Sequence, residues 1–443
     1  MSIQEESTII IADDLTGAND TALQFFKSGL QTKVIIDSNY DIKTDGIDTT
    51  CVWAFSTESR NLPKEKALET IIETTKKLQE NLNSDSFYKK IDSTLRGNVG
   101  IETIALLEIL KKDAAIVAPA YIEENRTTIG GYQLLNGIPI ERTQVALDPK
   151  SPILNSFIPD ILKKDLNPQL FDYIGMINFE TISKGAGPIN LKIKELIQKG
   201  KKIIIVDAIS TVDLEQIALA IDKSSYNLLP TGSAGLALAI NKIKYDNPKQ
   251  PSHIKHCPSC ARLFLSGSAT QLTKNQIQKL KQEKEIFSVD LTINDVLEQN
   301  KKIIDIVCEK LAQNTDVIIH SSSIFNNNIE SENENLKEDL IDAGIPKDEL
   351  ANLITDYLAD LIEEINHRQD FILIMIGGET SFKSLKKINS KYLQIIDTIL
   401  PAIPLCVDFS GKVIVTKSGN FGTLNTLIEI VNYFDRLKTN EKL

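Results

Sequence analysis

Short apolar runs alternate with longer amphipathic stretches through the first half of the chain. Runs rich in β-branched residues occur at 7–12, 32–37, 49–55, 114–120 and 201–208. Between them lie 18–30 and 65–82, where apolar positions recur with the spacing of one helix face. Alternating strands and helices favour a mostly parallel sheet with helices on both faces. We therefore predict an α/β fold.

The same alternation restarts in the second half, at 262–270, 315–323, 370–381 and 412–422. The segment before it is rich in proline and polar side chains, which is typical of a linker. A chain of 443 residues also exceeds the usual size of a single hydrophobic core. The sequence therefore predicts two domains, 1–245 and 263–443, joined by a linker at 246–262. Each domain is expected to contain a mostly parallel sheet flanked by helices.

Charge and composition narrow the kinds of partner. The chain carries 49 basic and 60 acidic residues, and this net charge of -11 argues against a general affinity for nucleic acid or for an anionic membrane. The N-terminus does not resemble a signal peptide, and no apolar run is long enough to cross a membrane. Five scattered cysteines do not form a disulfide framework. We expect a cytoplasmic protein that binds small molecules, with a homo-oligomer as an open alternative.

Ligands of open α/β sheets bind beyond the carboxyl ends of the strands, so the residues after each strand are candidates for a site. Asp13 and Asp14 follow the first strand, and adjacent carboxylates bind Mg²⁺ or accept a proton from a hydroxyl group. The alternative is that one aspartate caps the following helix. After the third strand, Arg60 could bind a carboxylate through two parallel hydrogen bonds. The alternative for Arg60 is a solvated side chain.

The next strand end is the most polar one, because residues 89–98 read KKIDSTLRGN. Lys90 and Arg96 would neutralise a carboxylate or a phosphate, Asp92 would orient a hydroxyl group, and Ser93 and Thr94 would add short donors. The alternative is a helix start capped by Ser93 or Thr94, with the basic pair in water. The segment 117–137 lacks clear periodicity, and long irregular segments in compact domains are often functional.

Strand ends of the second half carry glycine and hydroxyl residues with little charge. Glycine permits close backbone approach and φ > 0, so successive N–H groups form anion-binding nests that suit a polyphosphate. Each loop alone could be an ordinary turn, and neither a Walker A loop nor a GxGxxG after a strand is present. Three such loops in one domain favour a nucleotide. The candidates are Ser266, Gly267 and Ser268; Gly377, Gly378, Glu379 and Thr380; and Lys417, Gly419 and Gly422.

In their order along the chain, these motifs resemble the four-carbon acid sugar kinase family, which includes threonate, erythronate and 3-oxo-tetronate kinases. The motifs are ADDLTGA, TESR, KKIDSTLRGN, TGSAGLA, SGSAT, GGETS and KSGNFG, between about residues 8 and 425. The resemblance implies an N-terminal domain that binds the acid sugar, a C-terminal domain that binds ATP, and phosphoryl transfer in the cleft between the domains. Ala269 departs from the cysteine or similarly small residue expected there, which bears on the side-chain contacts of that loop and not on its backbone role.

Carried over residue by residue, the resemblance assigns two groups of ligand contacts. The acid-sugar pocket would be lined by Asp14, Arg60, Lys90, Asp92 and Ser93, with Thr94 and Arg96 in the same turn. The ATP site would be lined by Ser266, the run Gly377–Thr380 and Gly419. The KKIDSTLRGN turn would then hold a small polyhydroxy carboxylate.

The predicted function is transfer of a phosphoryl group from ATP, with Mg²⁺, to the terminal hydroxyl of a four-carbon sugar acid. D-Threonate and D-erythronate are favoured, and 3-oxo-tetronate is the alternative. The reaction needs positioning, neutralised charge and a carboxylate near the attacking hydroxyl, for which Asp14 or Asp13 is the candidate. A non-catalytic binding protein would not need the charged residues of the first half, and an isomerase or aldolase would not need a nucleotide.

One further cluster suggests different chemistry. His253, His256, Cys257 and Cys260 lie in the predicted linker, and all four are of zinc-ligand types. The adjacent His256 and Cys257 are poorly placed to share one metal, and no second CxxC exists. A plain linker is the favoured interpretation, and the metal ligands stay unassigned.

Overall fold

The computed structural model describes residues 7–37, 40, 51–82, 84–148, 150–245, 260–324 and 346–439. The chain divides into two compact units, Met1–Pro251 and Ser252–Leu443. Among the helices in the described ranges, none is long and apolar enough to cross a membrane. Most of the predicted linker, including His253, His256 and Cys257, lies outside the described residues, whereas Cys260 is described and is a free cysteine.

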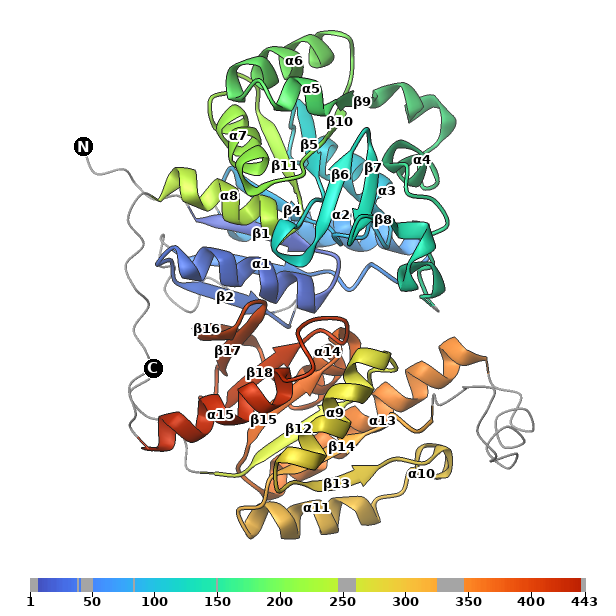
Figure 1. Ribbon diagram of the computed structural model, residues 1–443, viewed down its shortest axis with the longest axis vertical. Helices are drawn as coiled ribbons and strands as arrows, with labels where there is room; N and C mark the ends of the chain where they lie inside the picture. Colours follow the sequence, from blue (N-terminus) through green and yellow to red (C-terminus); the bar gives the residue numbers. More distant parts are fainter. Residues whose placement is uncertain are drawn as a thin grey trace. The chain divides into compact units, whose positions relative to one another are not determined.

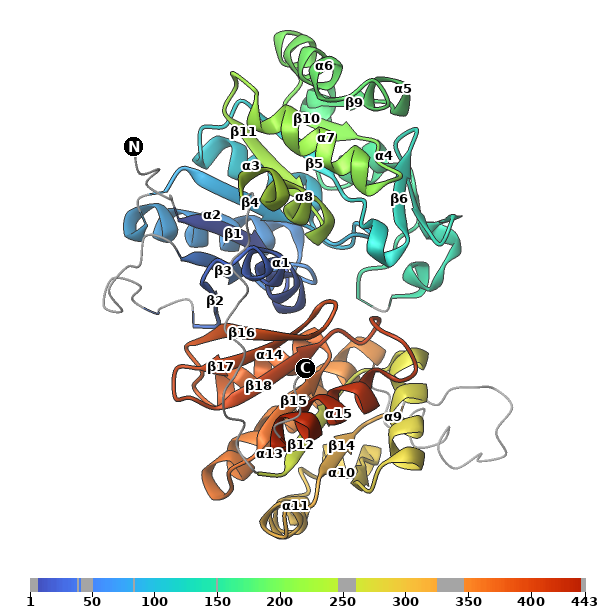
Figure 2. The same cartoon turned by 60° about the vertical axis from the view of Figure 1, so that its left-hand side comes forward.

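The first unit is built on a parallel sheet with the strand order β2-β3-β1-β4-β11-β5-β10-β9 (Figures 1 and 2). The strands are β1 (Thr8–Ala12), β2 (Thr32–Ile35), β3 (Val52–Ser56), β4 (Ser86–Lys90), β5 (Ala114–Ala118), β9 (Ile174–Ile177), β10 (Ile203–Val206) and β11 (Leu228–Gly232). Strands such as β1, β5 and β10 are buried along their whole length. A strand that is covered on both faces needs apolar side chains at nearly every position. Such strands can therefore be predicted from continuous apolar runs in the sequence.

Helices pack in series against the two faces of this sheet. One layer contains α1 (Leu15–Lys27), α8 (Ala234–Lys244), α7 (Thr211–Asp222) and α6 (Ala186–Gln198), each packed against the next (Figure 1). The other layer contains α2 (Lys64–Asn81), α3 (Val99–Ile109) and α4 (Ile158–Lys163). Helix α1 begins three residues before the predicted stretch 18–30, because Asp14 caps it and accepts a hydrogen bond from the backbone N–H of Gly17.

The segment predicted to be irregular forms a small antiparallel sheet of β6 (Arg126–Ile129), β7 (Tyr132–Leu135) and β8 (Ile138–Pro139). Gly130 and Gly131 make the β6–β7 turn with φ of +60° and +76°, the conformation that two-residue hairpin turns require. The buried carboxylate of Asp207, after β10, accepts the N–H groups of both glycines at 2.8 and 2.9 Å. The hairpin is therefore anchored to the main sheet. Short elements complete the unit: η2 (Ile122–Glu124), η3 (Ile140–Arg142), η4 (Gln144–Leu147), η5 (Pro168–Tyr173) and α5 (Phe179–Ile182).

The second unit has a mixed sheet with the order β13-β14-β12-β15-β18-β17-β16. Its strands are β12 (Arg262–Ser266), β13 (Phe287–Asp290), β14 (Val317–His320), β15 (Ile372–Ile376), β16 (Tyr392–Leu400), β17 (Ile403–Asp408) and β18 (Val413–Lys417). The pairs from β13 to β18 are parallel, and β17 is antiparallel to both β18 and β16. The prediction of two α/β units with mostly parallel sheets is confirmed.

The helices of the second unit also form two layers. Helix α9 (Gln271–Glu283) packs against α15 (Thr426–Thr439), and both cover a core that includes Phe264, Leu405 and Phe434. Helix α13 (Lys347–Arg368) packs against α14 (Gly378–Lys387), α11 (Lys302–Ala312) and α10 (Ile293–Leu297). This unit therefore also has three layers, with the sheet between two layers of helices. The helices bury one apolar face, and the strands are apolar along most of their length.

Candidate functional site

The predicted site residues of the first unit lie at a point where the strand order reverses. From β1 the chain builds β2 and β3 on one side, and β4 then adds to the other side of β1. In open parallel sheets, ligands bind at the carboxyl ends of strands next to such a reversal, because the loops that leave the strands there diverge. The loops after β1, β3 and β4 are therefore the ones brought together.

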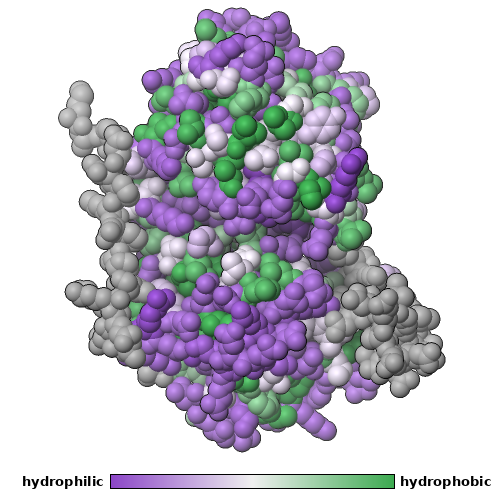
Figure 3. Space-filling model, in the orientation of Figure 1, coloured by the Kyte–Doolittle hydropathy of each residue, from purple (hydrophilic) through white to green (hydrophobic). Residues whose placement is uncertain are grey.

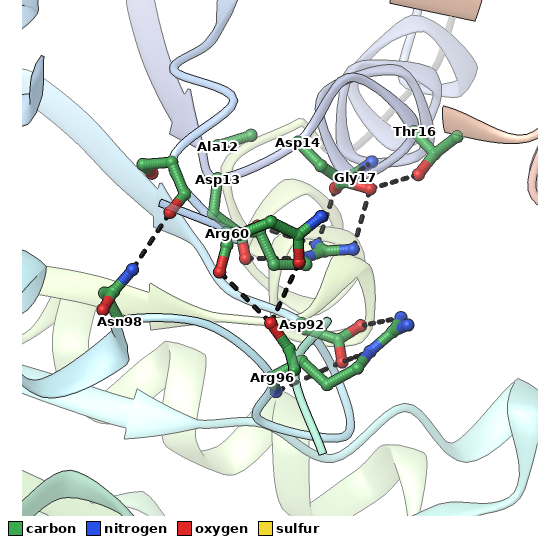
Figure 4. A network of polar contacts seen from close by, with 12 residues as sticks. Ala12, Asp13, Asp14, Thr16, Gly17, Arg60, Asp92, Arg96 and Asn98 are labelled. Carbon is green, nitrogen blue, oxygen red and sulfur yellow. Dashed lines mark hydrogen bonds and ion pairs between the residues drawn. The ribbon is translucent and has the colours of Figure 1, made fainter. Parts of the chain in front are cut away.

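Arg60 binds both aspartates of the first loop (Figure 4). Its Nε and Nη2 donate to the two carboxylate oxygens of Asp13 at 2.8 and 2.9 Å. Its Nη1 and Nη2 donate to those of Asp14 at 2.8 and 2.7 Å. The interpretation of Arg60 as a solvated side chain is wrong, since its side chain is only 12% exposed. Four of its five N–H groups are used by this fork, which holds the two carboxylates in place.

Burial and the positive charge of Arg60 act in opposite directions on the Asp13 carboxyl group. Burial alone would raise the pKa of Asp13, but the charge and hydrogen bonds of Arg60 outweigh it and hold that pKa below its usual value. Asp14 also accepts from the backbone N–H of Gly17 at 2.9 Å and from the hydroxyl of Thr16 at 2.5 Å. The capping interpretation is thus confirmed for Asp14, and the same carboxylate belongs to the ion-paired cluster.

The KKIDSTLRGN segment is a compact turn and not a capped helix start. Leu95 and Gly97 have φ of +62° and +93°, and α3 begins only after Asn98, with no side-chain cap. Arg96 donates through Nε to Asp92 at 2.8 Å and through Nη1 to Asp148 at 2.9 Å. Burial would raise the pKa of Asp92, but the charges of Arg96 and Arg60 hold it well below its usual value. Arg96 is therefore ion-paired rather than solvated.

Lys89 and Lys90 point to opposite sides of β4, as alternate strand residues do, and their surroundings differ. Lys89 is fully buried and ion-paired with Glu102, which also accepts a hydrogen bond from Ser59 at 2.6 Å. Lys90 is only 5% exposed, and within the described residues its Nζ has no hydrogen bond or ion pair. A Cβ on Gly17 would lie 2.8 Å from that Nζ and 2.6 Å from Asp14 Oδ1. The Lys90 ammonium group therefore lies beside Asp14, and no carboxylate of the described ranges forms an ion pair with it.

Two residues of this cluster were not singled out from the sequence. Glu58 adopts a left-handed φ of +49°, and its Oε1 accepts from the backbone N–H of Leu15 at 2.8 Å and from Ser56 at 2.5 Å. Asp20, one turn along α1 from Thr16, is buried and accepts from Tyr121 and Gln24 at 3.3 Å. In the sequence, Glu58 is recognisable only as an acidic residue after an apolar run, and Asp20 only as an acidic residue within an amphipathic stretch.

The Glu58 carboxyl group is expected to make stability depend on pH. Burial, with a contribution from the Asp14 charge, raises its pKa to about 8. Between about pH 4.5 and 8, the unfolded chain releases this proton while the folded chain keeps it, so the free energy of unfolding falls as pH rises. The free energy of unfolding of Glu58→Gln, relative to that of the wild type, should therefore be larger at pH 8 than at pH 5.

Urea denaturation at the two pH values measures this effect. Glu108→Gln, an exposed position on the neighbouring α3, is the matched control. Parallel pH dependence in the wild type and in Glu58→Gln would contradict the assignment.

Three predicted loops of the second unit meet at the carboxyl ends of β12, β15 and β18. The carbonyl oxygen of Gly419 accepts from the hydroxyls of Thr270 and Thr273, both at 2.9 Å. The N–H of Gly377 donates to the carbonyl of Lys417 at 2.8 Å. A Cβ on Gly267 would lie 2.5 Å from Thr380 Oγ1. The glycines are therefore required by the close approach of the three loops.

The glycines of these loops have different roles. The positive φ belongs to Gly377, at +110°, whereas Gly378 is the first residue of α14. Gly422, with φ of +89°, lies in the turn before α15, and the atoms nearest to a Cβ there all belong to Thr426. The structure therefore brings together the loops of Ser266–Ser268, Gly377–Thr380 and Lys417–Gly419, with Gly422 in the turn that follows.

Lys417, at the end of β18, is a fully buried lysine. Its Nζ donates to the carbonyl oxygen of Ser418 at 2.7 Å, and within the described residues no carboxylate is paired with it. Burial lowers its pKa to about 7. A buried amine without a counter-ion is costly, so an anionic ligand at these loops would stabilise its charged form.

Metal-ligating side chains do not gather anywhere in the described residues: no group of three or more His, Cys, Asp or Glu side chains there could hold an ion. Of the four candidate zinc ligands, only Cys260 falls within that part of the chain. Burial raises the pKa of its thiol.

Two domain models match this chain in the order of its two units. A sugar-binding N-terminal domain matches residues 8–240, and a nucleotide-binding C-terminal domain matches residues 263–427. Among solved structures, a Haemophilus influenzae protein shares the fold with a TM-score of 0.71 and 22% identity, covering 96% of this chain and 100% of that chain.

Curated relatives cover nearly the whole chain. A D-threonate kinase of Salmonella typhimurium is 26% identical over 97% of this chain and 98% of its own length. A D-erythronate kinase of Heliobacterium modesticaldum is 26% identical, with 98% of each chain covered. A 3-oxo-tetronate kinase of Haemophilus influenzae is 25% identical over 93% of this chain and 96% of its own length.

Proposed function

The chain belongs to the four-carbon acid sugar kinase family, and on this premise we propose that it transfers the γ-phosphoryl group of ATP to the terminal hydroxyl of a four-carbon sugar acid. D-Threonate and D-erythronate are the favoured acceptors, and 3-oxo-tetronate is the alternative. The acid would bind at the loops after β1, β3 and β4, and the nucleotide at the loops after β12, β15 and β18.

One observation carries the proposal: the Lys90 ammonium group is buried and forms no ion pair within 4 Å among the described residues, although it lowers the pKa of Asp13 and partly offsets the burial of Asp20 through its charge. Arg60 and Arg96, by contrast, already pair with Asp13, Asp14, Asp92 and Asp148. An ammonium group held in that way attracts a carboxylate, and a charge-assisted hydrogen bond to it is stronger than a neutral one. The carboxylate of the sugar acid would therefore bind Lys90.

Asp14 is our candidate for the carboxylate that orients the attacking hydroxyl. It lies beside Lys90, and its side chain is 13% exposed, against 4% for Asp13. Its ion pair with Arg60 fixes the orientation of its carboxylate. This suits phosphoryl transfer, which depends on positioning and on stabilisation of charge more than on a strong base. Asp13 would keep Arg60 in place from the other side.

The glycine-containing loops of the second unit would hold the polyphosphate. Successive backbone N–H groups at the start of α14 and the Lys417 ammonium group offer positive charge to it. Mg²⁺ binds such sites through substrate phosphates and one or two carboxylates, so the absence of a three-ligand cluster among the described residues fits an ion that arrives with the nucleotide. Glu379, in the first turn of α14, is the candidate carboxylate, and the ion would neutralise phosphate charge.

A kinase assay over a panel of four-carbon acids tests the proposal. ATP consumption with D-threonate, D-erythronate or 3-oxo-tetronate in the presence of Mg²⁺ is expected, with the phosphate on the terminal hydroxyl of the product. A protein that binds ATP and an acid without transferring phosphate would be a binding protein. A protein that consumes no ATP with any acid of the panel and any divalent metal would not be this kinase.

Replacing the two neighbouring lysines should have different effects on stability. Lys90→Met removes the contact to the acid and should raise its KM by about 10- to 150-fold, and it should lower stability less than Lys89→Met does, because Lys90 forms no close ion pair among the described residues. Lys89→Met leaves Glu102 buried without its cation and should lower the free energy of unfolding by about 3–5 kcal/mol. Steady-state kinetics and urea denaturation of both variants measure the contrast. A Lys90→Met enzyme with unchanged KM would remove Lys90 from the acid site.

A further inference from the structure

A second polar site lies in the second unit, beside the loops just described. An open cavity of about 380 Å³ is bounded by α9 on one side and by the ends of β13 and β14 on the other. From α9 it is lined by polar side chains that include Lys274, Asn275 and Gln278, and the surface over this helix is hydrophilic (Figure 3). Its volume is within the range of small-molecule sites, and its lining suits a ligand rich in hydrogen-bonding groups.

The cavity adjoins the proposed phosphate loops. Ser266 of β12 pairs in register with His320 of β14, and the N–H of Ser321 donates to the Ser266 carbonyl at 3.2 Å. Helix α9 starts directly after the Ser266–Thr270 loop, and its first residue, Gln271, lines the cavity. Adjacent strands are about 4.8 Å apart, so a ligand whose phosphates lie on the Ser266 loop reaches the cavity with its next groups.

The strand ends present a carboxylate that is fixed at one oxygen. Asp290 Oδ1 accepts from the Ser323 hydroxyl at 2.9 Å and lies 3.2 Å from Nδ1 of the buried His320. The other ring nitrogen, Nε2, is 3.1 Å from the Ser288 hydroxyl, which fixes the imidazole. No hydrogen bond or ion pair within the described residues ends on Asp290 Oδ2, and the side chain is 43% exposed.

The ionisation of Asp290 suits a hydrogen-bond acceptor. Burial would raise the pKa of its carboxyl group, but the hydrogen bond and charge of His320 outweigh this effect and lower it. The carboxylate is therefore available to hydroxyl donors at neutral pH. In dinucleotide-binding βαβ units, an acidic residue about 20 residues after the phosphate loop accepts a hydrogen bond from a ribose hydroxyl. Asp290 follows the Ser266–Thr270 loop at a comparable position, at the end of the next strand along the chain.

We infer that this cavity holds the nucleoside part of the nucleotide, with Asp290 accepting hydrogen bonds from the ribose hydroxyls and the polar side chains of α9 facing the base. The inference rests on the proposed function in that it takes ATP as the phosphoryl donor. The ends of β13 and β14 would then contact the nucleoside, although none of the sequence motifs lies there.

Titration calorimetry of the full chain, with ATP or tripolyphosphate as the ligand and Mg²⁺ present, separates the contribution of the nucleoside from that of the phosphates. Asp290→Ala should weaken ATP binding by about 10- to 100-fold, because a hydrogen bond to a charged group is lost. Binding of inorganic tripolyphosphate should stay within about twofold, because the phosphate loops are intact. The wild type should bind 2′,3′-dideoxy-ATP as weakly as Asp290→Ala binds ATP.

Two further variants keep the test decisive. Glu285→Ala removes the same charge from an exposed position of the same unit outside the cavity lining, and should leave ATP affinity unchanged. Gln278→Trp, at an exposed helix position that lines the cavity, should fill it and weaken ATP but not tripolyphosphate.

The outcomes distinguish this inference from the proposed function. Unchanged ATP affinity in both Asp290→Ala and Gln278→Trp, or an equal loss of tripolyphosphate binding, would overturn the nucleoside pocket while kinase activity stands. If the wild type binds neither ATP nor tripolyphosphate, the proposed function and the pocket fail together.

Discussion

Replacing Arg60 with methionine is expected to abolish most of the kinase activity and to destabilise the first unit. Arg60 holds Asp13 and Asp14 with four hydrogen bonds of 2.7 to 2.9 Å in a largely buried position. Removing one partner of a buried ion pair costs about 3–5 kcal/mol, because the remaining charges stay buried without compensation. The two carboxylates would then repel each other, and Asp14 would lose the orientation that the acceptor hydroxyl needs.

Measurements on Arg60→Met should show kcat/KM for the sugar acid lowered by about 100-fold or more, because a displacement of about 1 Å in a catalytic group costs on that order. ATP binding by calorimetry should be nearly unchanged, because the glycine-containing loops belong to the other unit. Arg60→Lys should be intermediate, since a lysine cannot reproduce the planar fork, and it keeps the test informative if the methionine variant fails to fold.

The control for Arg60 is Arg142→Met, which removes an arginine whose side chain is 76% exposed. It should change neither activity nor stability by more than about 0.5 kcal/mol. Equal losses of acid and ATP binding in Arg60→Met would contradict the division of the two ligands between the two units.

Adding a single methyl group to the phosphate loops should impair nucleotide binding selectively. A Cβ on Gly419 would overlap the hydroxyl of Ser268 and lie 3.2 Å from its Cβ, and one on Gly267 would meet Thr380 Oγ1 at 2.5 Å. Overpacking of this kind costs about 1–3 kcal/mol. We expect Gly419→Ala and Gly267→Ala each to raise the apparent KM for ATP by roughly 5- to 150-fold, with the KM for the acid unchanged.

Gly187→Ala is the matched control for the glycine variants. It adds the same methyl group at an exposed position in the first turn of α6, where nothing lies within 4 Å and φ is not positive. Steady-state kinetics with each substrate varied in turn measure the effect, and melting curves confirm that the variants are folded. If both loop variants have the same apparent KM for ATP as the wild type, the three loops are only turns and the nucleotide binds elsewhere.

The sequence by itself determined the class of fold and the general location of the candidate site. Strands buried on both faces need continuous apolar residues, so runs such as 7–12 and 114–120 are recognisable without any knowledge of their partners. In a parallel sheet the polar residues that follow such runs share one edge, which is why Asp13, Arg60 and Lys90 could be grouped before their distances were known. These features depend on local pattern alone.

Hairpin formation at 126–135 and the antiparallel β17 could not be predicted in the same way. Both depend on pairing with strands whose choice is set by packing, and the hairpin turn is also held by Asp207, which is 76 and 77 residues away from its two glycines. The positive φ at Gly377 rather than at Gly378 is likewise a consequence of where α14 begins. Local preference allows several conformations at these sites, and tertiary contacts select one.

Only the tertiary structure decided which charges are paired and which are left for a ligand. Lys89 and Lys90 are indistinguishable as residue types, but Lys89 forms an ion pair with Glu102 in the interior, whereas Lys90 forms no ion pair within 4 Å among the described residues. Arg60 could equally have bound a ligand carboxylate, yet its fork is occupied by Asp13 and Asp14. Ion pairs form between groups a few ångströms apart in space, and that distance is set by how segments distant in the sequence pack.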